Sequence, residues 1–93
     1  MPRPKKTRRC EGAIHYEVFA PVDASLDKIK QVELHRDELE ALRLCDSLGL
    51  TQEEAGIRMG VSRGTVQRIV TVARKKVSTS LSAGYSIIFV DDE

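Results

Sequence analysis

The stretch MGVSRGTVQRIV, residues 59–70, constrains the fold more than any other part of the chain. Gly60 can adopt the left-handed conformation that ends a helix, and Ser62 can cap the following helix with its side-chain oxygen. The stretch therefore predicts two helices that meet at a very short turn, with Val61 filling the angle between them. After Ser62, apolar residues recur at intervals of three and four, as on a helix with one buried face. They are Val66, Ile69, Val70, Ala73, Val77 and Leu81.

A first helix is predicted over about residues 36–48, in the segment RDELEALRLCDSLG. Gly49 provides its stop signal. The acids Glu38 and Glu40 are interpreted as part of an exposed helix face. The apolar residues of this helix form one stripe, predicted to be buried: Leu39, Leu42, Cys45 and Leu48.

A second helix, over residues 51–59, opens with a capping box. Thr51 can cap the amide of Glu54 while the Glu54 carboxylate reaches back to Thr51. Gly56 lies four residues before Gly60, where the second and third helices come closest and a small side chain is required. With the third helix at 62–82, the chain has the layout of a three-helix helix-turn-helix unit.

Strand-like alternation is confined to residues 13–19 and 85–90. All four aromatic residues of the chain lie in these segments, so the two strands are expected to pair, within one chain or across a dimer. Residues 22–33 stay ambiguous, since Ser25 could cap a short helical turn over Leu26, Ile29 and Val32. The predicted fold is mainly α: a flexible basic arm over residues 1–12, then a single helix-turn-helix domain over 13–93 with short terminal strands.

The net charge of +1 hides a strong segregation of charged residues along the sequence. Residues 1–10 carry five bases and no acid, residues 11–54 carry eleven acids and four bases, and residues 55–76 carry six bases and no acid. Two basic blocks separated by an acidic one indicate a polyanionic partner contacted at two places. The first basic block is the arm, with Arg3, Lys5, Lys6, Arg8 and Arg9.

The second basic block coincides with the third helix, whose N-terminal part would lie in the DNA major groove. Arginine pairs with guanine edges and glutamine with adenine edges, so the predicted base contacts are Arg63, Gly64, Gln67 and Arg68. Gly64 would leave space for close approach. The predicted DNA backbone contacts are Thr51, Gln52, Arg58, Ser62, Thr71, Arg74 and Lys75. The basic arm is expected to follow the DNA backbone or the minor groove.

Catalysis and metal binding find little support in the sequence. There is no glycine-rich phosphate loop and no nucleophile motif, so the chain is not expected to be an enzyme. Cys10, His15, His35 and Cys45 lack the spacing of zinc ligands, and neither metal nor cofactor is predicted. Cys45 is interpreted as a core residue, and His35 as a cap of the first helix. Without an export signal or a membrane-length apolar run, a cytoplasmic location is expected.

A family resemblance covers residues 2–10 and 34–78. It rests on the segments DELEALRL, TQEEA and MGVSRGT and on the basic opening RPKK-RR. The chain resembles small, largely uncharacterised bacterial and archaeal proteins predicted to bind DNA, whose helix-turn-helix is similar to region 4 of sigma factors. Family members often have cysteine at the position of Thr7. The resemblance implies a transcription-related role in DNA binding.

The sequence as a whole therefore predicts a DNA-binding transcriptional regulator. A homodimer that reads two half-sites is expected, because one recognition helix contacts only a few base pairs. RNA polymerase is a further candidate partner. The alternative is a protein-interaction module that docks on the transcription machinery through its acidic helix at 36–48. RNA binding by base stacking is disfavoured by the absence of aromatic residues between positions 20 and 84.

Overall fold

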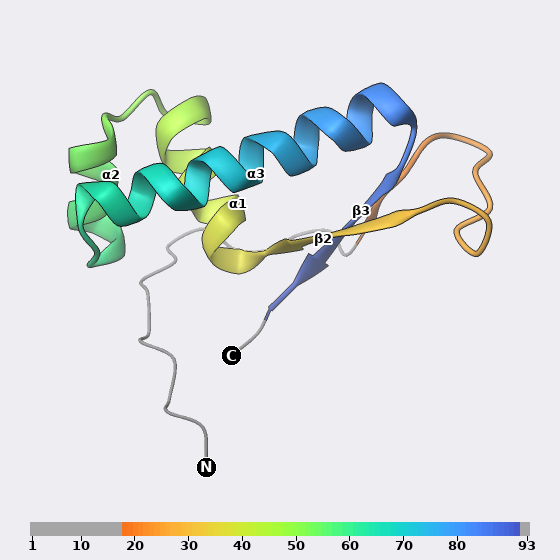
Figure 1. Cartoon of the computed structure of the whole chain (residues 1–93), viewed down its shortest axis with the longest axis horizontal. Helices are drawn as coiled ribbons and strands as arrows, with labels where there is room; N and C mark the ends of the chain where they lie inside the picture. Colours follow the sequence, from red (N-terminus) through yellow and green to blue (C-terminus); the bar gives the residue numbers. More distant parts are fainter. Residues whose placement is uncertain (1–17, 92–93) are drawn as a thin grey trace, which may run out of the picture.

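A computed structural model of the chain describes residues 18–91 (Figure 1). The basic arm and residues 13–17 of the first predicted strand lie outside this range. The predicted mainly helical fold with short strands is confirmed. In chain order the elements are β1 (Val18–Phe19), β2 (Gln31–His35), α1 (Arg36–Leu42), a π-helical segment η1 (Arg43–Ser47), α2 (Gln52–Met59), α3 (Arg63–Ala83) and β3 (Ser86–Val90).

The three strands form one sheet in the order β1-β3-β2. β1 pairs with β3 in antiparallel orientation, and the rings of Phe19 and Phe89 meet edge to face with centroids 5.9 Å apart. The two terminal strands therefore pair within one chain. Of the two arrangements left open by the sequence, the described structure contains the one that needs no second copy.

β2 was not predicted as a strand. A turn does form at Ser25, whose carbonyl oxygen accepts from the amide of Lys28 at 2.9 Å. The chain is extended by Gln31, however, and Val32 lies in β2 rather than in a helical turn. β2 runs parallel to β3, with Val32 opposite Ile87. The short segment becomes a strand because a partner strand from the far end of the chain lies beside it.

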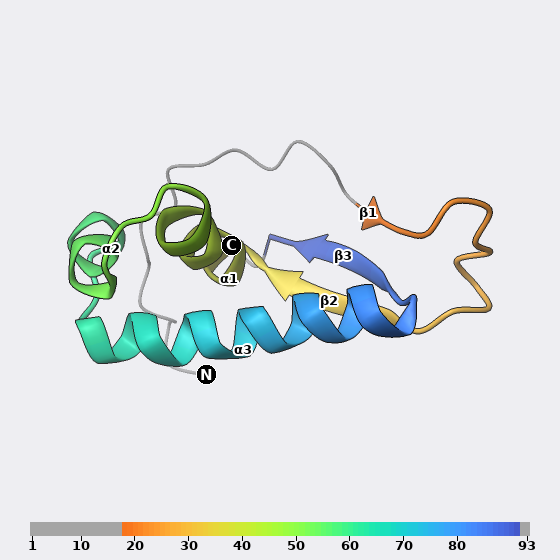
Figure 2. The ribbon, with the colours of Figure 1, turned by 90° about the horizontal axis from the view of Figure 1, so that it is seen from above.

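Helix α3 contributes side chains to two hydrophobic cores (Figure 2). Its N-terminal half packs with α1 and α2 in the helical core. Its C-terminal half lies along the sheet, where Ala73 joins Leu34 and Ile87 in the sheet core. Because one continuous helix takes part in both cores, contacts along its whole length fix the orientation of the N-terminal half of α3. The buried members of the helical core are Ala41, Leu44, Ala55, Met59, Val66 and Val70.

Two residues of the predicted apolar stripes are exposed, and those predictions were wrong. Leu48 follows η1, where the amide of Leu48 donates to the carbonyl of Arg43 five residues earlier. This wider π-type turn shifts Leu48 off the stripe that a regular α-helix would continue. The buried centre of the first helix is instead Ala41 with Leu44. Leu81 is exposed in the last turns of α3.

Gly56 is the point of closest contact between α2 and the turn that follows it. A methyl group on Gly56 would lie 2.7 Å from the carbonyl oxygen of Val61, a backbone atom that cannot rotate away. Overpacking of this kind costs about 1–3 kcal/mol, whereas alanine favours a helix over glycine by about 1 kcal/mol. The replacement Gly56→Ala is therefore expected to lower the free energy of unfolding by up to about 2 kcal/mol. Urea denaturation followed by circular dichroism measures this change, and a raised midpoint would contradict the close contact.

Candidate nucleic-acid interface

The connection between α2 and α3 fixes where α3 begins. Gly60 has the left-handed backbone, with φ 71° and ψ 33°, that the sequence predicted for the helix end. The amide of Val61 donates to the carbonyl of Gly56 at 2.9 Å, and Val61 packs against the helical core. The Ser62 hydroxyl oxygen accepts from the amide of Thr65 at 3.2 Å, which confirms the predicted cap. With the connection held at these points, α3 starts at Arg63 in one defined orientation.

Anchoring of α3 leaves a polar face exposed to solvent. Val66 and Val70 are fully buried, so the residues on the opposite side of the helix point outward. The four predicted base contacts lie together in the first two turns of α3. On this helix the exposed members of the predicted interface are Arg63, Gln67, Arg68, Thr71, Arg74 and Lys75, and Gly64 is half-buried between them.

The polar side chains of this face differ in what already engages them. Within residues 18–91, no hydrogen bond or ion pair engages Arg63, Gln67 or Lys75. Arg68 donates from Nη2 to the hydroxyl oxygen of Thr65 at 3.2 Å. Since a guanidinium has five N–H donors, Arg68 keeps donors for a further partner.

Arg74, predicted as a phosphate contact, forms an ion pair with Asp46 at the end of the first helix. Nε of Arg74 lies 3.0 Å from Oδ2 of Asp46, and Nη2 lies 2.8 Å from Oδ1. The hydrogen bonds from Arg74 lower the pKa of the Asp46 carboxyl, and the same pair raises the pKa of Arg74. Asp46 was not among the residues predicted for the interface. No local pattern joins two residues 28 positions apart.

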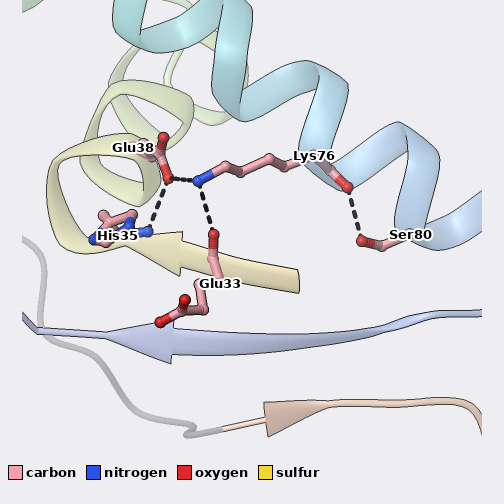
Figure 3. A network of polar contacts seen from close by, with 5 residues as sticks. All are labelled: Glu33, His35, Glu38, Lys76 and Ser80. Carbon is pink, nitrogen blue, oxygen red and sulfur yellow. Dashed lines mark hydrogen bonds and ion pairs between the residues drawn. The ribbon is translucent and has the colours of Figure 1, made fainter. Parts of the chain in front are cut away.

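Lys76 is turned away from this face and links α3 to α1 and β2 (Figure 3). Its Nζ donates to Oε1 of Glu38 and to the backbone carbonyl of Glu33, each at 2.8 Å. Together with the Arg74 pair, this contact neutralises two of the six bases in the acid-free block. The positive charge offered to a partner is therefore smaller than the sequence count indicates.

The prediction that Glu38 and Glu40 form an exposed face was wrong, because both are buried. Glu38 accepts from Lys76 and from the backbone amide of His35 at 2.9 Å. His35 is indeed the N-cap residue of α1. Glu40 is only 3% exposed and binds Arg43 through both carboxylate oxygens, at 2.8 and 3.0 Å. Burial of these carboxylates is tolerated because each has a cation at hydrogen-bond distance.

The predicted contacts on α2 lie beside the start of that helix and along its exposed side. Thr51 and Glu54 form the predicted capping box: the Thr51 hydroxyl accepts from the Glu54 amide at 3.0 Å, and Glu54 accepts from the Thr51 amide at 2.9 Å. These hydrogen bonds lower the pKa of the Glu54 carboxyl. Thr51 and Arg58 are exposed, and Gln52 is half-buried. The hydroxyl hydrogen of Thr51 is not consumed by the cap.

Metal-binding groups do not gather in the described part of the chain. Among residues 18–91, no three His, Cys, Asp or Glu side chains lie close enough together to hold a metal ion. Cys10 and His15 are outside this range. Cys45 packs partly buried against the helical core, and its burial raises the pKa of the thiol. No helix in this part of the chain combines the length and apolar character needed to cross a membrane.

The whole chain, residues 1–93, matches the family described as "Protein of unknown function DUF134". The UPF0251 protein of Clostridium novyi (strain NT) is 47% identical over 87 residues, which cover 94% of this chain but only 59% of that relative. The UPF0251 protein of Vibrio parahaemolyticus is 41% identical over 93 residues, covering 100% of this chain and 97% of the relative. No solved structure matches the chain. Since the match extends over its full length, the chain belongs to the DUF134 family.

Proposed function

We propose that this protein binds double-stranded DNA in a sequence-specific manner and acts as a transcriptional regulator. In this proposal α2, the turn at 60–62 and α3 form a helix-turn-helix similar to region 4 of sigma factors, with α3 in the major groove. One observation carries the proposal: the first turns of α3 expose unengaged Arg63 and Gln67 side chains next to a glycine that the fold does not need.

Gly64 is the most informative residue of this face. A glycine within a helix costs up to about 1 kcal/mol of stability relative to alanine. At Gly56 the fold explains that cost, because a methyl group would collide with the backbone. At Gly64 a methyl group would meet only Nη1 of Arg68, at an ordinary 3.8 Å, and the backbone has no positive φ. A partner surface that approaches the α3 backbone closely, such as a base edge in the major groove, supplies the missing reason.

The proposed contacts divide into those that read bases and those that hold phosphates. Arg63 and Arg68 have the donor geometry for guanine, and Gln67 suits adenine. Lys75, two turns further along α3, is placed for a phosphate. The remaining proposed phosphate contacts are Thr51, Gln52, Arg58, Ser62, Thr71 and Arg74, with the basic arm on the backbone or minor groove.

A homodimer remains part of the proposal because two half-sites give one short recognition helix a longer operator. The pairing of β1 with β3 within the chain means that dimer formation would use another surface. The alternative function, docking on the transcription machinery through the acidic first helix, receives less support. Burial and pairing of Glu38 and Glu40 remove two of the charges that such a surface would present.

The replacement Gly64→Ala tests the proposal through two readouts of opposite sign. The free energy of unfolding is expected to rise, by up to about 1 kcal/mol. Affinity for a DNA site selected from a random pool is expected to fall about tenfold, since the methyl group would push the base edge away. Urea denaturation and fluorescence anisotropy with labelled DNA measure the two effects.

Ser82→Ala, at an exposed position near the far end of α3, is the matched control. It improves helix propensity in the same helix and is expected to leave DNA affinity unchanged. Equal affinities for Gly64→Ala and the unmodified chain would remove Gly64 from the interface. Absence of salt-sensitive binding to any DNA by the unmodified chain would overturn the proposed function.

A further inference from the structure

We infer that Asp46 is an intramolecular competitor of DNA phosphate for Arg74, and that this carboxylate limits the DNA affinity of the protein. The inference rests on the proposed function and extends it to a residue outside the predicted interface. Asp46 in η1 accepts hydrogen bonds from the guanidinium of Arg74 in α3 through both carboxylate oxygens, at 2.8 and 3.0 Å. The two side chains are 50% and 43% exposed for Arg74 and Asp46, so the pair is open to solvent and to a partner.

The pair lies along the side of α3 that the proposal assigns to DNA. Arg74 follows Gln67 by seven residues and Thr71 by three, so at 3.6 residues per turn these side chains project from the same side of the helix. A DNA backbone that passes this side two turns beyond the base contacts meets the Asp46 carboxylate beside the Arg74 guanidinium. The Asp46 carboxylate repels phosphate, whereas the Arg74 guanidinium attracts it.

The chemistry of the pair makes it displaceable. Asp46 accepts from the Nε–H of Arg74 and from one N–H of its Nη2, which leaves Arg74 with three further N–H donors. A phosphate must therefore replace the carboxylate or bind next to it. The hydrogen bonds from Arg74 keep the pKa of Asp46 low, so the competing charge is complete at neutral pH. Exposed ion pairs contribute little to stability, and the fold does not depend on keeping this one closed.

The contrast with Lys76 separates a structural ion pair from a competing one. Lys76 bridges α1, α3 and β2, and its carboxylate partner Glu38 also caps a helix. Asp46 has no hydrogen-bond or ion-pair partner other than Arg74 within residues 18–91. Loss of the Asp46 charge therefore frees a cation on the proposed DNA side without opening a core.

The test compares Asp46→Asn with the unmodified chain over a salt series, using fluorescence anisotropy and one selected DNA site. Asparagine keeps the shape of the side chain and removes its charge. One additional phosphate contact steepens the slope of log affinity against log salt by about 0.9. The ratio of the variant's DNA affinity to that of the unmodified chain should therefore grow about eightfold as salt falls from about 1 M to about 0.1 M. In the Asp46→Asn/Arg74→Gln double variant this gain should disappear.

Asp91→Asn is the matched control, because Asp91 also forms an exposed pair with an arginine, Arg36, at 3.1 Å. It changes the net charge equally but lies after β3, and its salt slope should equal that of the unmodified chain. An Asp46→Asn slope equal to that of the unmodified chain, or an equal gain from Asp91→Asn, would overturn the inference while leaving the proposed function intact. Failure of the unmodified chain to bind DNA at all would instead overturn the proposed function, and this inference with it.

Discussion

Replacement of Lys76 by methionine is expected to lower the free energy of unfolding by about 2–3 kcal/mol. Methionine keeps much of the aliphatic stem but removes the ammonium that contacts Glu38 and the Glu33 carbonyl (Figure 3). Loss of one partner leaves a carboxylate that is 12% exposed without its cation. The expected loss is below the ~3–5 kcal/mol typical of fully buried pairs, because Lys76 itself is 26% exposed. Urea denaturation at neutral pH measures it.

Lys75→Met is the matched control for this experiment. Lys75 is the next residue back along α3, it is exposed, and no partner engages its side chain within residues 18–91. Its replacement should change stability by less than about 0.5 kcal/mol. The Glu38→Gln/Lys76→Met double variant should lose less than the sum of the single losses, because the two residues share one interaction. Equal losses from Lys76→Met and Lys75→Met would show that the network does not stabilise the fold.

Local signals explain which parts of the fold were predictable from the sequence. Gly60, Ser62 and the Thr51–Glu54 capping box each act on a backbone group no more than four residues away. Their roles therefore follow from the sequence and are confirmed by geometry. The buried face of α3 was predictable for the same reason. Val66, Val70 and Ala73 recur at intervals of three and four residues, and all three are fully buried.

Several of the parts that were missed depend on partners far away in the chain. β2 forms because it pairs with β3, and all three helices lie between these two strands in the sequence. Glu38 is buried because Lys76, 38 residues later, supplies its cation, and Arg74 is engaged because α3 passes η1. A count of charges along the sequence cannot show these pairs. The candidate interface therefore has fewer free cations than the basic block. Among the described residues, its unengaged side-chain donors on α3 are Arg63, Gln67, Thr71 and Lys75.

Replacement of Arg63 by alanine is expected to weaken binding to a selected DNA site by about 1–3 kcal/mol and to relax the sequence preference. Arg63 stands at the first position of α3, exposed and without an ion-pair partner in residues 18–91. Its donors need no prior release before they meet a guanine edge. Arg68→Ala is expected to have an effect of the same kind, although Arg68 first gives up its 3.2 Å hydrogen bond to Thr65. Competition of the selected site against scrambled DNA measures affinity and preference together.

Lys75→Ala separates base reading from phosphate binding on the same helix. Lys75 lies twelve positions beyond Arg63, where α3 has left the groove and runs beside the backbone in the proposed geometry. Its loss should weaken binding to selected and scrambled DNA equally and reduce the salt slope by about one contact. If all three variants change preference and salt slope alike, the division into base and phosphate contacts is wrong. If none of them changes salt-sensitive binding, the face of α3 is not the surface that meets DNA.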